Sequence, residues 1–246
     1  MDAAKAHIIT QLKKDIHCLQ GFKNTRGNTV LDTGLGVIKN AFPDAEFPLG
    51  AVHEFIAAGR EDATATTGFV SGLLAALMQE QGAAIWISNQ RNIFPPALKL
   101  FGLHPERIIF IQLTKEKEIL WAMEEALKCK GLVAVVGEIP ELSFMVSRRL
   151  QLAVEQSQVT GFILRNNPRK INITACVTRW KITTLPSALP AGMPGVGFPK
   201  WNVELLKVRN GKPGKWEIEF AAGCFRHIAE TLAIKAIPLS QQKKTG

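Results

Sequence analysis

Residues 50–81, GAVHEFIAAGREDATATTGFVSGLLAALMQEQ, constrain the fold of this chain more than any other stretch. They read as a short strand, a turn opened by Gly59 and a helix that begins near Thr66, because apolar side chains then recur at helical spacing. The apolar residues are Phe69, Val70, Leu73, Leu74 and Leu77. A strand, a turn and a helix in this order form the frame of a phosphate-binding loop, in which backbone N–H groups and the helix N-terminus hold phosphate.

The residues that give such a loop its chemistry are absent from this frame. The pattern G-x-x-x-x-G-K-[ST] needs Gly-Lys before Ser or Thr, whereas Thr64 and Ala65 stand before Thr66 and Thr67. Gly-Lys precedes Ser or Thr nowhere else in the chain. The degenerate loop therefore comprises Gly59, Glu61, Thr64, Ala65, Thr66 and Thr67.

Composition sets wider limits on the kind of protein. The chain has 246 residues, 46% of them hydrophobic, which is enough for a large single core. Its net charge of +9 fits either an acidic partner such as nucleic acid or simply a basic soluble protein. The charged N-terminus is not that of a secretory signal, and no run reaches the ~18 apolar residues of a membrane span. The histidines and the four cysteines do not have the spacing of metal ligands. We expect a cytoplasmic, nucleoid-associated protein without a metal or cofactor.

The order of apolar patterns predicts an α/β fold with a mostly parallel sheet flanked by helices. After the first strand and helix, strands are expected at 83–88, 107–113, 132–136 and 161–164, and helices at 92–101, 116–130 and 141–158. From residue 175 the period becomes that of strands, and a turn at 209–214 joins the last two into an antiparallel hairpin extension. Residues 3–22 form an expected amphipathic N-terminal helix. The predicted organisation is an N-terminal helical segment (1–46), a core domain (47–237) and a flexible tail (238–246).

The same strand, degenerate loop, helix and terminal hairpin resemble the RecA recombinase core, whose loop reads GPESSGKTT. The chain is more similar to the ImuA family of RecA-like proteins, through FPLGAVHEF, LWAMEEALKC, AVVGEIPELSFMVSRRLQLAVEQS, TGFILRNNPR and PGVGFPKWNVELLKVRNGKPGKWEIEFAAG. This resemblance implies a protein of DNA-damage-induced (SOS) error-prone translesion synthesis. It implies as partners an ImuB-like polymerase homologue and an error-prone polymerase subunit, with RecA as an open further partner. The cell-division inhibitor SulA is a more distant relative.

The resemblance also aligns three positions that carry ATP hydrolysis in RecA. Ala65 replaces the Lys that stabilises the transferred phosphoryl group, and Gly137 stands at the magnesium-associated Asp, with Glu138 one residue later on the other face of the strand. Gln90 replaces the water-activating Glu, and an amide is no general base. We therefore expect a non-catalytic adaptor. Anion binding at the helix N-terminus, a divergent DNA-dependent ATPase and a SulA-like division inhibitor stay open as alternatives.

Basic residues follow the strands whose loops hold single-stranded DNA in RecA. The second of these loops is reduced here to residues 166–170. The candidate contacts for DNA or a partner are Arg148, Arg149, Arg165, Arg169 and Lys170. The alternative for this cluster is a solvated face with structural salt bridges. The Gly- and Pro-rich residues 190–199 are a further candidate for a partner loop.

Overall fold

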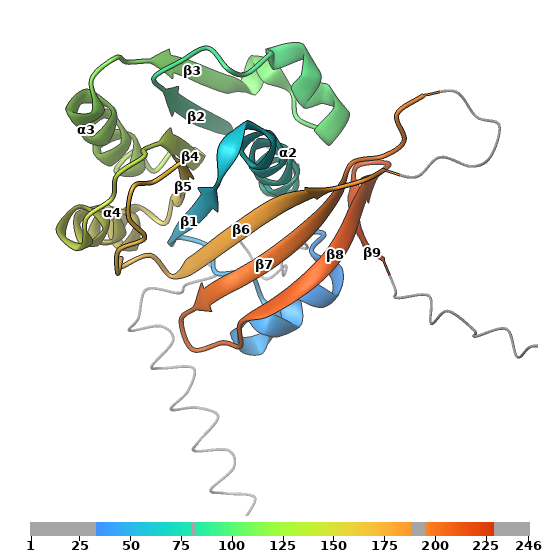
Figure 1. The fold of residues 1–246 in the computed structure, drawn as a ribbon. Coiled ribbons are helices and arrows are strands. Elements are labelled where there is room, and N and C mark those ends of the chain that lie inside the picture. The colour runs from blue at the N-terminus through green and yellow to red at the C-terminus, as the bar shows by residue number, and fades with distance from the viewer. Residues whose placement is uncertain (1–32, 80–81, 188–194, 229–246) are drawn as a thin grey trace, which may run out of the picture.

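A single nine-stranded sheet organises the molecule (Figure 1). The computed structural model describes residues 33–79, 82–187 and 195–228. The strand order is β3-β2-β4-β5-β1-β6-β7-β8-β9. Strands β3 to β6 in that order pair in parallel, and β6 to β9 pair antiparallel. The strands are β1 (Val52–Ala57), β2 (Ala83–Ser88), β3 (Ile108–Gln112), β4 (Leu132–Glu138), β5 (Thr160–Asn166), β6 (Thr178–Leu185), β7 (Lys200–Val208), β8 (Gly214–Ala221) and β9 (Cys224–His227).

Helices cover both faces of the parallel part (Figure 1). Helix α2 (Gly59–Leu77) packs on one face, while α3 (Glu116–Leu127) and α4 (Phe144–Ser157) share a second hydrophobic cluster on the other. Helix α4 begins where Ser143 accepts a hydrogen bond from the Val146 N–H through its side chain. The short 3-10 helices are η1 (Gly36–Ala41), η2 (Pro43–Ala45), η3 (Pro95–Phe101) and η4 (Pro105–Arg107).

This architecture confirms the predicted fold class: a mostly parallel sheet between helices, with an antiparallel C-terminal extension. The short helix expected within 92–101, with its start at Pro95 and Pro96, is a 3-10 helix over Pro95–Phe101. Pro95 and Pro96 occupy its first turn, where Pro is tolerated because the N–H that it lacks would have no partner within the helix. The expected N-terminal helix at 3–22 and the tail at 238–246 lie outside the described residues, as does much of the segment 190–199.

Residues 33–46 pack into the main core and do not stand apart from it. Leu35, Ile38 and Phe42 are buried in the cluster that also contains α2. The carbonyl of Ala41 accepts a hydrogen bond of 2.8 Å from the N–H of Lys212 in the turn between β7 and β8. The described part of the expected N-terminal segment is thus bound to the antiparallel extension.

Aromatic rings fill the space between α2 and the extension. Two glycines of α2 allow this close approach: a Cβ at Gly72 would lie 2.6 Å from Cζ of Phe225, and one at Gly68 would lie 3.0 Å from Phe101 and Trp201. The rings in mutual contact here are Phe55, Phe69, Trp180, Trp201, Phe220 and Phe225. Trp180 and Trp201 therefore serve the core, and Trp180, at 0% exposure, has no face left for stacking on bases.

Candidate functional site

Helix α2 begins at Gly59, so the expected start near Thr66 is wrong. The residues between are compatible with a helix, and Glu61 and Asp62 in the first turn complement the positive end of the helix dipole. The Gly59 N–H donates to the side-chain oxygen of Asn167 at 2.6 Å, so a residue that follows β5 satisfies the helix start. Within the helix, the Thr64 hydroxyl donates to the carbonyl of Arg60 at 2.9 Å.

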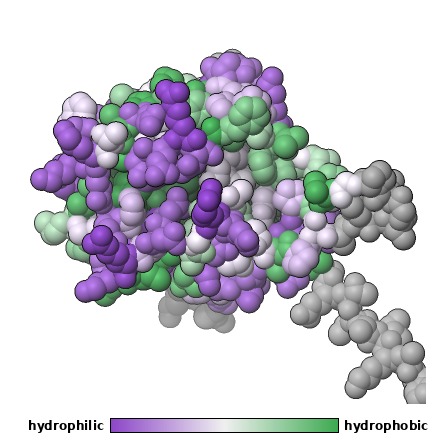
Figure 2. Space-filling model, turned by 45° about the horizontal axis from the view of Figure 1, so that its top comes forward, coloured by the Kyte–Doolittle hydropathy of each residue, from purple (hydrophilic) through white to green (hydrophobic). Residues whose placement is uncertain are grey.

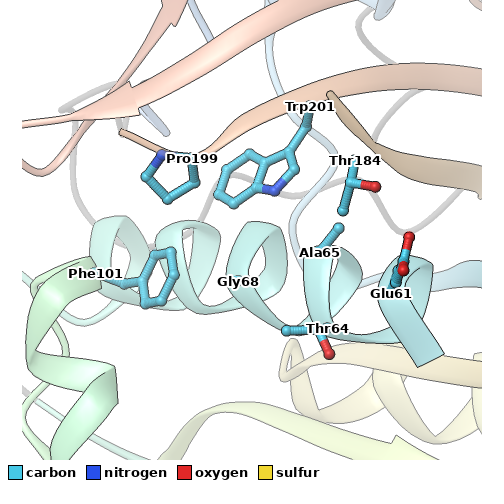
Figure 3. Close-up of a pocket in the computed structure, with 8 residues that line it drawn as sticks. All are labelled: Glu61, Thr64, Ala65, Gly68, Phe101, Thr184, Pro199 and Trp201. Carbon is cyan, nitrogen blue, oxygen red and sulfur yellow. The ribbon is translucent and has the colours of Figure 1, made fainter. Parts of the chain in front are cut away.

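The degenerate loop is consequently two turns of helix and not an open loop. Ala65 projects from α2 toward Thr184 and Trp201, whereas Thr64 projects from the opposite edge of the helix, with Glu61 and Gly68 one turn before and after Ala65 (Figure 3). They form one wall of a largely apolar pocket of about 450 Å³, which Phe101, Thr184, Pro199 and Trp201 complete. Thr66 is buried, and Thr67 is half-buried with its carbonyl bonded to Ser71. Ala65 faces aromatic and aliphatic groups here, where a phosphate loop would place a Lys beside phosphate.

The positions aligned with RecA's acidic residues lie at the carboxyl ends of β4 and β2. A Cβ at Gly137 would lie 2.5 Å from the sulfur of Met123 in α3, so no carboxylate fits there unless the Met123 side chain moves. Glu138 points to the opposite face, as expected from strand alternation, and accepts a hydrogen bond of 3.2 Å from the Trp86 indole. Burial raises the pKa of the Glu138 carboxyl above its ordinary value.

Gln90 follows β2 on the exposed surface, where its carbonyl accepts a hydrogen bond from the Ser88 hydroxyl. In the part of the chain that the structure describes, no hydrogen bond joins Gln90 to Glu138, and no three His, Cys, Asp or Glu side chains are placed to hold a metal.

Arg165 is buried, and its inclusion among the surface contacts is wrong. Its guanidinium donates to Glu54 at 2.6 Å, and both side chains are 0% exposed. Arg179 donates to the other carboxylate oxygen at 2.8 Å, and the Thr174 hydroxyl to the same oxygen at 2.9 Å. A carboxylate and two guanidinium groups from the neighbouring strands β1, β5 and β6 thus form a buried ionic cluster.

Glu54 is the residue that sequence reasoning missed. It lies in β1, whose six residues are all buried, so the polar pair His53-Glu54 inside an otherwise apolar strand was the available signal. A buried carboxylate needs a buried cation, and the sequence does not show which of the many Arg residues supplies it.

The buried acid and its two arginines lie beneath the connection from β5 to β6, residues 167–177, which we call the crossover. Strands β5 and β6 both run parallel to β1 between them, so the chain must return across the sheet. Side chains, and not a strand ladder, hold most of its backbone. The bonds run from Arg165 to the carbonyl of Lys170 (2.8 Å), from Arg179 to that of Asn172, from Lys207 to that of Thr174 (2.8 Å), from the Arg169 N–H to Glu141 (2.8 Å) and from the Ala175 N–H to Ser147 (2.9 Å).

The other four candidate basic residues are exposed on α4 and the crossover. Arg149 pairs with Glu124 of α3 and is therefore partly a structural link between the two helices. Arg148, Arg169 and Lys170 form no ion pair with any described residue. The molecule's surface is mainly hydrophilic with scattered hydrophobic patches on the face drawn in Figure 2.

His53 is buried beside Glu54 on the other face of β1 and is held as a neutral ring. Its Nε2–H donates to the carbonyl of Pro48 at 2.8 Å, so its Nδ1 accepts from the Thr178 hydroxyl at 2.8 Å. Burial lowers the pKa of His53 from 6.5 to about 3. The ring is therefore a structural link in the core and has no access to a proton donor in solvent.

The parallel sheet, the helix after its central strand and the antiparallel extension define a RecA-like α/β protein. A KaiC-like protein of Pyrococcus horikoshii has the same fold, with a TM-score of 0.56 at 13% identity over 81% of this chain and 99% of that one. No family model matches the chain. Protein ImuA of Caulobacter vibrioides is 35% identical over 202 residues, which cover 77% of this chain and 83% of the relative, and the chain belongs to the ImuA family. The cell division inhibitor SulA of Yersinia pestis is 27% identical over 136 residues, 55% of this chain and 80% of that protein. None of the helices in the described ranges has the length and apolar character needed to cross a membrane.

Proposed function

We propose that this protein is a non-catalytic accessory factor of DNA-damage-induced (SOS) error-prone translesion synthesis. In this role it connects an ImuB-like polymerase homologue to an error-prone polymerase subunit, with RecA as a further partner, and reaches DNA directly or through them. Membership of the ImuA family supports the pathway. The observation that carries the non-catalytic part is the start of α2 at Gly59. The N–H groups of Thr64 to Thr67 then lie inside the helix, bonded to carbonyls four residues earlier, and are not free to surround a phosphate.

The electrostatics of this helix start support the same proposal. The N–H of Gly59, the first residue of α2, is already bonded to the side chain of Asn167. Glu61 and Asp62 bring negative charge to the first turn, where a triphosphate would have to bind. Two further groups on which phosphoryl transfer depends are missing, because position 65 carries Ala in place of Lys and position 137 carries Gly in place of Asp, with the Met123 sulfur 2.5 Å from where a Cβ would lie.

Calorimetry with ATP and magnesium tests the non-catalytic proposal. We expect no binding heat from the wild type. We also expect none from Ala65→Lys, since position 65 faces the largely apolar pocket beside Trp201 and the backbone N–H groups around it are bonded within the helix. Ala65→Lys should instead lower the midpoint of thermal unfolding. Thr64→Lys, on the exposed side of the same turn, is the matched control and should leave it unchanged. Micromolar ATP binding by the wild type would overturn the proposal and favour a divergent ATPase or a nucleotide-gated switch.

The adaptor role is tested with purified partners. Size-exclusion chromatography should show a complex between this protein and the ImuB-like protein, and elution of the two as separate peaks would refute the role. The similarity to SulA favours division inhibition as the second candidate. Stable binding to a cell-division protein, without binding to the ImuB-like protein, would establish that candidate instead.

A further inference from the structure

We propose that a surface formed by α4 and the crossover is the docking site for an acidic polypeptide segment that carries apolar side chains. We call it the crossover surface, and its residues are Phe144, Arg148, Arg169, Lys170, Ile171 and Ile173. The inference rests on the proposed adaptor function, to which it adds a surface and the chemistry of the partner.

The apolar part of this surface is exposed without a structural reason. Ile173 is 81% exposed, Ile171 59% and Phe144 50%. Single exposed apolar residues are ordinary, but these three belong to two segments that touch. The Ala175 N–H binds the Ser147 hydroxyl, and Phe144 lies one turn before Ser147 on the same side of α4.

Positive charge surrounds these apolar residues. The acids nearby are neutralised, since Glu54 lies between Arg165 and Arg179, and Glu141 lies 3.8 Å from Arg165. Arg148, four residues after Phe144 on the same side of α4, and Arg169 and Lys170, which precede Ile171, keep charges that pair with no described residue. A partner segment that complements this surface is therefore acidic, with apolar side chains to cover the isoleucines.

A polypeptide fits this surface better than nucleic acid does. Proteins that bind single strands without a base code use aromatic rings for stacking, and the two most exposed apolar side chains here, Ile173 and Ile171, are aliphatic. Nucleic acid would leave Ile171 and Ile173 without apolar contact, whereas a Leu or Phe of a peptide would remove them from water.

The crossover is also held in place before any partner binds. The carbonyls of Lys170, Asn172 and Thr174 accept hydrogen bonds from the side chains of strands β5, β6 and β7. These bonded residues alternate along the crossover with the exposed Ile171 and Ile173. A segment fixed in this way loses little conformational freedom on binding, and the affinity gained per contact is correspondingly higher.

The experiment measures binding of the purified ImuB-like protein to wild type and variants by biolayer interferometry. We expect the double variant Ile171→Ser/Ile173→Ser to bind about tenfold or more weakly, as truncation at the centre of an interface does. Arg169→Gln/Lys170→Gln should weaken binding at low salt more than at high salt. The control Leu100→Ser removes an equally exposed apolar side chain from η3 and should bind as the wild type does. Unchanged thermal unfolding of the variants confirms their folding.

Wild-type affinity in the isoleucine variant would overturn the inference and leave the adaptor role intact. If the ImuB-like protein does not bind the wild type at all, the adaptor role fails, and selection from a random peptide library decides the surface separately. Enriched peptides should be acidic and apolar and should not bind the isoleucine variant. No enrichment, or enriched peptides without acidic residues, would refute the site. It would also be refuted if the isoleucine change abolished binding of a single-stranded oligonucleotide or self-association in sedimentation, because the occupant would then be DNA or a second copy.

Discussion

Replacement of Glu54 by Gln should be among the most destabilising single-atom changes that this protein allows. Glu54 is 0% exposed and accepts hydrogen bonds from Arg165, Arg179 and Thr174. The amide keeps one acceptor oxygen and presents an NH₂ group to one of the guanidinium groups, so two largely buried cations lose their counter-charge. Removal of one partner from a buried ion pair costs about 3–5 kcal/mol, and we expect Glu54→Gln to lower the free energy of unfolding by that amount.

Urea denaturation followed by tryptophan fluorescence measures this change, since Trp180 and Trp86 are buried in the native state. The matched control is Glu219→Gln, which removes the same charge from a partly exposed pair with Lys200 at 3.7 Å and should cost at most about 1 kcal/mol. An equal loss in the two variants would show that the Glu54 network does not hold the crossover as argued. In hydrogen exchange, Glu54→Gln should also lower the protection of the crossover more than that of β4.

Two further perturbations test the core on the α2 side. Because the native pKa of His53 is about 3 and the unfolded one about 6.5, the unfolded chain binds the additional proton below pH 6.5, so stability falls as pH drops through this window. The free energy of unfolding should fall by about 2 kcal/mol between neutral pH and pH 5. The fall should be smaller in His53→Gln. Equal pH profiles of the two proteins in urea titrations would contradict the burial argument. Gly72→Ala should lower the free energy of unfolding by about 1–3 kcal/mol despite the better helix propensity of Ala, because the new methyl meets Phe225. Gly131→Ala, where a Cβ meets nothing within 4 Å, should be nearly neutral in the same urea titrations, and an equal loss in the two variants would refute the packing argument.

Periodicity sufficed to predict the sheet and its helices because buried strands and amphipathic helices follow a local repeat. Strands such as β2 and β4 therefore lie where apolar runs predicted them. The start of α2 could not be predicted in this way. Its position depends on Asn167, a residue far along the chain that bonds the Gly59 N–H, and on acids at Glu61 and Asp62 that a phosphate-loop template treats as loop residues.

The candidate site was predicted in part, and the prediction for Arg165 was wrong because it relied on charge alone. A basic residue after a strand suggests surface contact, yet the side chain of Arg165 turns inward to Glu54. The sequence shows how many cations a chain has and not which of them are bound to a buried acid. The aliphatic residues Ile171 and Ile173 were missed for a related reason: the sequence does not show whether an isoleucine between two strands is buried or exposed, and only the three-dimensional arrangement does.

The position of Asn167 links two parts of the molecule mechanically. Its backbone N–H binds the carbonyl of Ala57 at the end of β1, and its side chain binds the first N–H of α2. The same residue begins the crossover. A force that lifts the crossover from the sheet must therefore break the bond that caps α2 or displace the first turn of that helix. The two segments respond to load as one unit, and strain applied at one is felt at the other without any nucleotide between them.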